Sequence, residues 1–360
     1  MEKEVSAVCV SPLNIELREF EVPSIGPHEL LIEVEAVGVC GTDVEMFEGR
    51  KSAPFPIIFG HETVGRVYEV GHEAAKIYNV KQGDRVVLEP YIMCKNCEYC
   101  LRGHYQLCKN MRCYGVTISC EEPPHLWGAY GEYVYVAPGS RVHKISEDVP
   151  VEAAALATVV GNGIRWVCTK GKVDAGDVVV VLGPGAQGLV STMVSKYRGA
   201  DMVILVGLSR DRRRLALGRE FGADYVVEAD KEDVIERVKE LTDGEMADVV
   251  ISCAPSPTAI KLGVDLLKPL GTYVMVALIG KREVPIATDK VVMKELKILG
   301  GLGQALNVET AIKLMEKRVY PIEKLVTHVF PLEKAEEALK VAGYKVEGEE
   351  PIKVVIKPKK

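Results

Sequence analysis

The stretch that decides the fold is Val178-Val-Val-Val-Leu-Gly-Pro-Gly-Ala-Gln-Gly188, in which four valines lead into a glycine-rich turn. Gly183, Gly185 and Gly188 form a G-x-G-x-x-G pattern, and the residues from Gln187 onward have the composition of a helix. In a strand–turn–helix unit, such glycines let the backbone turn sharply and approach a pyrophosphate, which the helix N-terminus stabilises. An ordinary glycine-rich turn is the alternative. The complete βαβ context favours dinucleotide binding.

Toward the C-terminus, apolar runs alternate with helical segments. The runs include MVILVGL, ADYVV, ADVVISCA and GTYVMVAL, and such continuous apolar runs are typical of parallel strands buried on both faces. Helices are expected between them at 187–198, 212–221, 231–241 and 258–267. This alternation predicts a doubly wound α/β domain with a parallel sheet.

The N-terminal half has a different pattern. Short β-type runs such as LLIEVEAVGV, GDRVVLEP and AYGEYVYVAP are separated by glycine and proline, which predicts a largely antiparallel, barrel-like body. The final run IKVVIK has no obvious partner in the α/β domain, so we expect it to return to the N-terminal body. The predicted domains are therefore 1–158 with 302–360, and 159–301 as an insertion.

Composition narrows the classes of function. A chain of 360 residues with 48% hydrophobic and 27% charged residues suggests a globular protein of two domains. The net charge of −6 argues against a nucleic-acid partner, and no apolar run is long enough for a membrane span. The first residues show no secretory pattern, so we expect a cytoplasmic protein that acts on a small molecule.

Four of the ten cysteines lie close together, as Cys94, Cys97, Cys100 and Cys108. In a reducing compartment this C-x2-C-x2-C-x7-C spacing indicates a metal site rather than disulfides. Four thiolates suit a closed tetrahedral zinc site that holds a loop in shape. An iron–sulfur cluster is the alternative, but the spacing differs from that of the common ferredoxin motifs. We interpret the cluster as a structural zinc site.

Two further segments, Gly38-Val-Cys-Gly-Thr-Asp43 and Gly60-His-Glu62, carry candidate catalytic residues. Alone, Cys40 would be an ordinary buried cysteine and His61 a histidine in a turn. Together with the cysteine cluster and the glycine motif, they resemble the zinc-containing medium-chain dehydrogenase/reductase family over essentially the whole chain. That family includes alcohol, sorbitol, threonine and glucose dehydrogenases.

The resemblance implies a GroES-like barrel for the N-terminal domain, with a Rossmann domain inserted before the C-terminal segment. It also implies that Cys40 and His61 bind a catalytic zinc and that Thr42 relays the substrate proton. Asp43 is expected to orient His61. Many relatives have a histidine three residues after the relay threonine, whereas this chain has Glu45.

The third protein ligand of the catalytic zinc is less obvious. Relatives often have a Cys, Asp or Glu where this chain has Thr158, and a threonine hydroxyl is a poor zinc ligand. Glu62 is the nearest acid in sequence, and the resemblance to sorbitol and glucose dehydrogenases allows it to bind zinc directly. The alternative is that Glu62 pairs with an arginine and water completes the coordination. We favour direct ligation.

The cofactor is expected to be NADP or NAD, with a preference for NADP. The second strand of the α/β domain ends near Gly207, where an acidic residue would bind the ribose hydroxyls of NAD. Ser209 and Arg210 follow and suit a 2′-phosphate. A solvated helix start is the alternative role of these residues.

These features predict a zinc-dependent enzyme that transfers a hydride between a secondary alcohol, polyol or sugar and NAD(P). A reductase that works mainly toward the alcohol is the closest alternative. A cofactor-binding structural or regulatory protein without catalysis is another, but such a protein should have lost Cys40, Thr42 or His61. The family also leads us to expect a homodimer or homotetramer.

Overall fold

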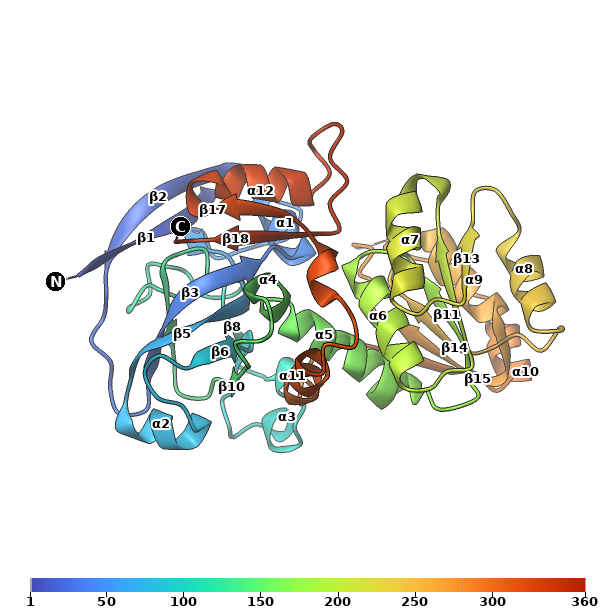
Figure 1. Ribbon diagram of the computed structural model, residues 1–360, viewed down its shortest axis with the longest axis horizontal. Coiled ribbons are helices and arrows are strands. Elements are labelled where there is room, and N and C mark those ends of the chain that lie inside the picture. The colour runs from blue at the N-terminus through green and yellow to red at the C-terminus, as the bar shows by residue number, and fades with distance from the viewer. Residues whose placement is uncertain (1, 281, 360) are drawn as a thin grey trace. The chain divides into compact units, whose positions relative to one another are not determined.

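The computed structural model describes residues 2–280 and 282–359 and divides into two compact units (Figure 1). One unit comprises Met1–Thr158 and Ala311–Lys360, and the other is Val159–Thr310. The chain passes from the first unit to the second within helix α5 (Ala157–Ile164) and returns within helix α11 (Val308–Glu316). The second unit is therefore inserted into the first along the sequence.

The first unit is built on a seven-stranded sheet with the order β10-β6-β5-β3-β18-β17, in which β9 also pairs with β3. Most neighbours are antiparallel, and β17 and β18 run parallel to each other. The C-terminal strand β18 pairs with β3 through Ile356 and Val37. The strands are β3 (Leu30–Gly38), β5 (Glu62–Val70), β6 (Arg85–Leu88), β9 (Tyr133–Val136), β10 (Val142–Lys144), β17 (Val326–Pro331) and β18 (Lys353–Lys357).

Smaller elements complete this unit. Strands β1 (Lys3–Ser11), β2 (Asn14–Glu21) and β4 (Ile57–Ile58) form a three-stranded sheet, and β7 (Tyr91–Ile92) pairs with β8 (Arg112–Cys113). The helices are α1 (Gly41–Phe47), α2 (His72–Tyr78), α3 (Glu98–Leu101), α4 (Val151–Ala154) and α12 (Ala335–Ala342), with short 3-10 turns at Tyr105–Leu107, Ile322–Leu325 and Leu332–Lys334.

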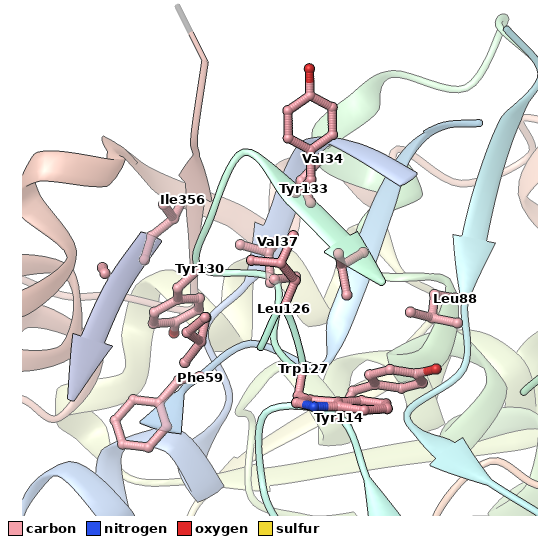
Figure 2. Packing of buried hydrophobic residues seen from close by; sticks show 14 of the residues in the cluster. Val34, Val37, Phe59, Leu88, Tyr114, Leu126, Trp127, Tyr130, Tyr133 and Ile356 are labelled. Carbon is pink, nitrogen blue, oxygen red and sulfur yellow. The ribbon is translucent and has the colours of Figure 1, made fainter. Parts of the chain in front are cut away.

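An apolar core rich in aromatic side chains fills the first unit (Figure 2). Trp127 stacks on Tyr114 with ring centroids 6.1 Å apart, and Phe59 meets the edge of Tyr130 at 6.3 Å. Each of these four side chains is at most 5% exposed. Aromatic side chains bury large areas, so this cluster makes a rigid support for the loops that follow β3 and precede β5.

The second unit contains a six-stranded parallel sheet with the order β13-β12-β11-β14-β15-β16. This order, with the first strand beside the fourth, is that of doubly wound dinucleotide-binding domains, so the predicted α/β fold is confirmed. The strands are β11 (Val178–Leu182), β12 (Met202–Gly207), β13 (Tyr225–Glu228), β14 (Ala247–Ser252), β15 (Leu267–Met275) and β16 (Lys297–Gly300). Sequence analysis did not predict β16, because this strand has only four residues and is only partly apolar.

Helices connect these parallel strands. They are α6 (Ala186–Tyr197), α7 (Arg212–Glu220), α8 (Val234–Leu241), α9 (Pro257–Asp265) and α10 (Thr288–Met293), with a π-helical segment at Arg165–Gly171 and a 3-10 turn at Ser209–Asp211. Local signals explain their starts: Asp233 caps α8 by accepting from the amides of Ile235 and Glu236, and Pro257 opens α9. Within the described residues, no helix has the length and apolarity needed to cross a membrane.

Candidate metal and cofactor sites

Cys40, His61 and Glu62 come together although two different segments supply them. Cys40 precedes α1 directly after β3, while His61 and Glu62 stand at the start of β5. Strands β3 and β5 are antiparallel, and their register places Gly38 beside Glu62. One ligand atom from each of the three residues lies within 4.8 Å of the others. Pairing of the two strands therefore brings Cys40 close to His61 and Glu62, which lie about twenty residues later in the sequence.

Asp43 lies beside His61, and Tyr130 in turn contacts Asp43. One carboxylate oxygen of Asp43 lies 3.2 Å from Nδ1 of His61, and the other accepts hydrogen bonds from the Cys40 amide and the Tyr130 hydroxyl. Burial opposes a charged imidazole, but Asp43 and Cys40 hold the pKa of His61 well above its ordinary value. A carboxylate at Nδ1 orients the ring and directs Nε2 toward a metal, as the resemblance implied for Asp43.

Lys353 is a partner of Glu62 that the sequence analysis did not predict. Its Nζ lies 2.5 Å from Oε2 of Glu62, and both side chains are less than a tenth exposed. Burial lowers the pKa of Lys353, yet the neighbouring Glu62 and Cys40 raise it overall, so the lysine is charged. Gly38 makes room for the pair, because a Cβ there would lie 2.2 Å from Oε2 of Glu62 and 3.1 Å from Lys353 Cε.

The structure corrects the partner expected of Glu62 in its alternative role, which the sequence analysis gave as an arginine. The basic partner is a lysine on the C-terminal strand β18 rather than an arginine. Lysine is a point charge and does not make the bidentate contact of a guanidinium. It occupies one carboxylate oxygen, which leaves Oε1 available to a metal. The carboxylate is therefore compatible with both roles.

The donor set fits a catalytic zinc ion. A thiolate, an imidazole and a carboxylate are three ordinary zinc ligands, and three protein ligands leave one position open. Thr42 is half-buried in the first turn of α1, two residues from Cys40. Thr158 is 4% exposed on α5, and its hydroxyl has no hydrogen-bond partner among the described residues. Such a hydroxyl is a poor zinc ligand, so Glu62 is the third donor in this set.

The four clustered cysteines also come together, with their sulfur atoms within 4.8 Å of one another. Cys94 and Cys97 precede the short helix α3, Cys100 lies within it and Cys108 follows it. The Cys100 amide donates to Cys97 Sγ, and the Cys97 amide donates to Cys94 Sγ. Amides of Cys100 and Lys109 lower the pKa of the Cys97 thiol to about 6, whereas burial raises that of Cys100 to about 12. Turns whose amides point at sulfur stabilise thiolates, which is what a closed zinc site requires.

The three glycines of the G-x-G-x-x-G turn have different local surroundings. Gly183 has φ +100°, which disfavours any other residue, and Gly188 packs so closely that a Cβ would lie 1.8 Å from the Gly183 carbonyl oxygen. Gly185 precedes α6, and a Cβ there would meet nothing within 4 Å. The first glycine thus allows the turn, the third allows helix–strand packing, and the second leaves open space at a helix N-terminus. This arrangement fits a dinucleotide pyrophosphate.

The end of β12 differs from the expectation based on sequence. Gly207 is indeed the last residue of β12, and Arg210 is exposed. Ser209, however, is engaged by Asp230: its amide donates to Oδ1 at 2.7 Å and its hydroxyl to Oδ2 at 2.5 Å. Sequence analysis missed Asp230 because it looked for an acid on β12 and not two residues beyond β13.

Comparisons with known proteins identify the family of the chain. The family model for the alcohol dehydrogenase GroES-like domain matches residues 26–147, and that for zinc-binding dehydrogenase matches residues 187–317. The chain is 37% identical over 359 residues to a Mycobacterium tuberculosis protein named "Probable alcohol dehydrogenase adh", which covers 98% of this chain and 97% of that protein.

Similar proteins include an enzyme acting on a polyol and a structure with bound cofactor. A sorbitol dehydrogenase from Halalkalibacterium halodurans is 33% identical over 344 residues, covering 95% of each chain. A zinc-binding dehydrogenase from Sinorhizobium meliloti, whose crystal structure contains NADP, superposes with a TM-score of 0.89 at 26% identity. That match covers 99% of this chain and 100% of the other.

Proposed function

The chain belongs to the zinc-containing medium-chain alcohol dehydrogenase family, and from this premise we propose that it oxidises a polyol, sugar or secondary alcohol at a zinc bound by Cys40, His61 and Glu62. Zinc-dependent, NAD(P)-linked dehydrogenation of alcohols or polyols is the activity of the family to which it belongs. The observation that carries the proposal is the convergence of a cysteine sulfur, an imidazole and a carboxylate, of which Glu62 is buried and the other two are partly buried.

The chain's own residues position the reactants and move the proton. Bound zinc supplies a Lewis acid for the substrate oxygen, and bound NAD(P) supplies the hydride acceptor. Thr42, two residues from Cys40, would relay the substrate proton: its oxygen would accept the hydroxyl proton of the substrate while its own hydroxyl proton passes outward to solvent. Glu45 follows three residues later on α1, and therefore on the same helix face, where Arg50 Nη1 lies 3.5 Å from its carboxylate. The Glu45 carboxylate can accept a hydrogen bond from a second substrate hydroxyl.

A substrate screen tests the proposed class. Polyols, sugars and simple secondary alcohols are offered with NAD and with NADP, and the reverse reduction is measured with the matching ketones. We expect polyols or sugars to have the highest kcat/KM. Glu45→Gln should raise KM for these substrates more than for a simple secondary alcohol. Absence of zinc-dependent turnover in either direction would favour the non-catalytic alternative.

Ligation by Glu62 is tested through the metal content of the purified protein. We expect the wild-type chain to hold two zinc ions, one in each donor cluster. Glu62→Gln should lose the catalytic zinc and keep the other, because an amide oxygen binds zinc more weakly than a carboxylate. Glu69→Gln is the matched control, since Glu69 is an exposed glutamate on the same strand. Retention of both ions in Glu62→Gln, with unchanged resistance to chelators, would support the alternative in which Glu62 only pairs with Lys353.

Two further assignments accompany this proposal. Cys94, Cys97, Cys100 and Cys108 hold the second, structural zinc, which shapes the segment between β7 and β8. A homodimer or homotetramer remains our expectation. Among the described residues, β16 is an edge strand of the parallel sheet, and the adjacent Met293 is 85% exposed. An unpaired strand edge beside apolar side chains is suited to pairing with a second copy. A monomeric mass in light scattering would contradict this expectation.

A further inference from the structure

The tip of β12 has no room for the acidic residue that commonly binds the adenosine ribose in this type of fold. A Cβ on Gly207 would lie 2.8 Å from Pro184 Cγ and 3.0 Å from Leu215 Cδ2. Pro184 belongs to the glycine-rich turn, and Leu215 is a buried residue of α7. Any side chain at position 207 would therefore have to displace the Pro184 ring or the Leu215 side chain. If this chain recognises the ribose hydroxyls with a carboxylate, that carboxylate must come from another position.

The segment that follows the neighbouring strand supplies a carboxylate. Strand β13 runs parallel to β12 with Glu228 beside Gly207, and the Ala229 amide donates to the Gly207 carbonyl. Two residues beyond this pairing, Asp230 and Ser209 lie side by side. The Asp230 carboxylate binds the Ser209 amide and hydroxyl at 2.7 and 2.5 Å. It is thus fixed at the carboxyl edge of the parallel sheet, where nucleotides bind in such folds.

The chemistry of Asp230 suits a ribose diol. Its side chain is exposed, and the two hydrogen bonds from Ser209 lower its pKa, so the carboxylate is ionised at neutral pH. An ionised carboxylate accepts hydrogen bonds from hydroxyl groups but repels a phosphate. Moreover, it already occupies the hydroxyl and amide of Ser209, which were the donors expected for a 2′-phosphate. The exposed Arg210 acts in the opposite direction and attracts a phosphate.

We propose that Asp230 takes the place of the missing acid on β12, binds the adenosine ribose hydroxyls and makes the enzyme prefer NAD to NADP. This inference rests on the proposed function, because it concerns the cofactor of the same reaction. It reverses the expectation of NADP drawn from Gly207, Ser209 and Arg210. These three residues lie at the end of β12 as expected, and the structure adds an anion, Asp230, that accepts hydrogen bonds from the amide and the hydroxyl of Ser209.

The test measures cofactor binding directly, without turnover. Dissociation constants for NAD+ and NADP+ are determined by isothermal titration calorimetry on the full-length zinc-loaded protein. Asp230→Asn removes the charge and keeps the shape of the side chain. Asp201→Asn is the matched control, because Asp201 is an exposed aspartate that precedes the opposite end of β12. Arg210→Ala is added in the Asp230→Asn background.

We expect the wild-type protein to bind NAD+ more tightly than NADP+. Asp230→Asn should weaken NAD+ binding about tenfold, through loss of a charge-assisted hydrogen bond, and should strengthen NADP+ binding about tenfold by removing repulsion. Asp201→Asn should leave both constants unchanged. In the double variant, loss of Arg210 should cancel most of the gain in NADP+ affinity.

Three results separate the possible failures. A wild-type preference for NADP+ would overturn the inference, as would an unchanged ratio of the two constants in Asp230→Asn. In both cases a cofactor still binds, and the proposed dehydrogenase function stands. If the zinc-loaded wild-type protein binds neither nucleotide, the proposed function itself fails, and the inference fails with it.

Discussion

Replacing Lys353 with methionine tests whether the lysine compensates the negative charge of Glu62 at the metal site. The change removes the cation 2.5 Å from Oε2 of Glu62 but keeps an apolar chain of similar length. Both partners are less than a tenth exposed, so the pair belongs to the buried class, in which loss of one partner costs about 3–5 kcal/mol. For a unit of about 200 residues, this corresponds to a decrease in melting temperature of about 6–20 °C.

The assay compares melting temperatures of zinc-free proteins by differential scanning calorimetry. Lys357→Met is the matched control, because Lys357 lies on the same strand and also contacts a glutamate at 2.5 Å. That pair is about a third exposed, so its loss should cost about 1 kcal/mol or less. Adding Glu62→Gln to Lys353→Met should restore part of the stability, since no buried anion is then left without a partner.

Zinc should reduce the effect of Lys353→Met. A bound zinc ion compensates the charge of Glu62, so the decrease in melting temperature should be smaller in the zinc-loaded protein than in the zinc-free one. The same variant should hold the catalytic zinc more firmly against chelators, because the whole carboxylate charge then faces the metal. If Lys353→Met loses no more stability than Lys357→Met in zinc-free protein, the Glu62–Lys353 pair does not balance the buried charge as argued.

Two further predictions concern the first unit. Cys97→Ser should remove one zinc ion and lower the melting temperature, while the enzyme that remains folded keeps its kcat. Cys168→Ser, which lies outside the cluster, is the control and should change neither the zinc content nor kcat. Unchanged metal content in Cys97→Ser would contradict a structural zinc. Burial raises the pKa of Glu4 to about 7 from 4.5, so the folded protein binds more protons than the unfolded chain between these values, and Glu4 should reduce stability progressively as pH rises from about 4.5 to 7. Glu4→Gln has one carbonyl oxygen, which can accept from the Glu132 amide, and an NH2 group that can donate to Ser6 Oγ. It should therefore match the wild type in urea unfolding near pH 4.5 and exceed it by up to about 3 kcal/mol above pH 7; a difference independent of pH would refute this reading.

The α/β unit was predictable in most of its detail because its signals are local. Four consecutive valines with a glycine turn indicate a buried parallel strand, and the alternation of apolar runs with helical segments determines the doubly wound class. Strand β16 was missed because Lys297–Gly300 is short and has no apolar periodicity. Its place in the sheet depends on pairing with β15, which is a tertiary contact and leaves little trace in local sequence.

Donor residues were easier to predict than the residues that control them. Cys40, His61 and Glu62 lie in short motifs, and their residue types together indicate metal binding rather than core packing. Lys353 lies almost three hundred residues after Glu62 and reaches it only because β18 pairs with β3, which in turn pairs with β5. A single lysine in an apolar C-terminal run has many ordinary explanations, so composition and spacing offer no signal for its role.

Both controlling residues, Lys353 and Asp230, follow one physical rule. The register of a sheet decides which charged side chains lie next to each other. Backbone pairing sets that register, and the residues of the motif do not. At the metal site, the absence of a side chain at Gly38 leaves the space beside β3 that Glu62 and Lys353 occupy. At the end of β12, Pro184 and Leu215 occupy the space beside Gly207, and the nearby carboxylate is that of Asp230, two residues beyond the adjacent strand. A motif search reads the glycine as an absent acid. The register of β12 and β13 places Asp230 beside Ser209, and the proposed preference for NAD follows from that placement rather than from the residues of β12 alone.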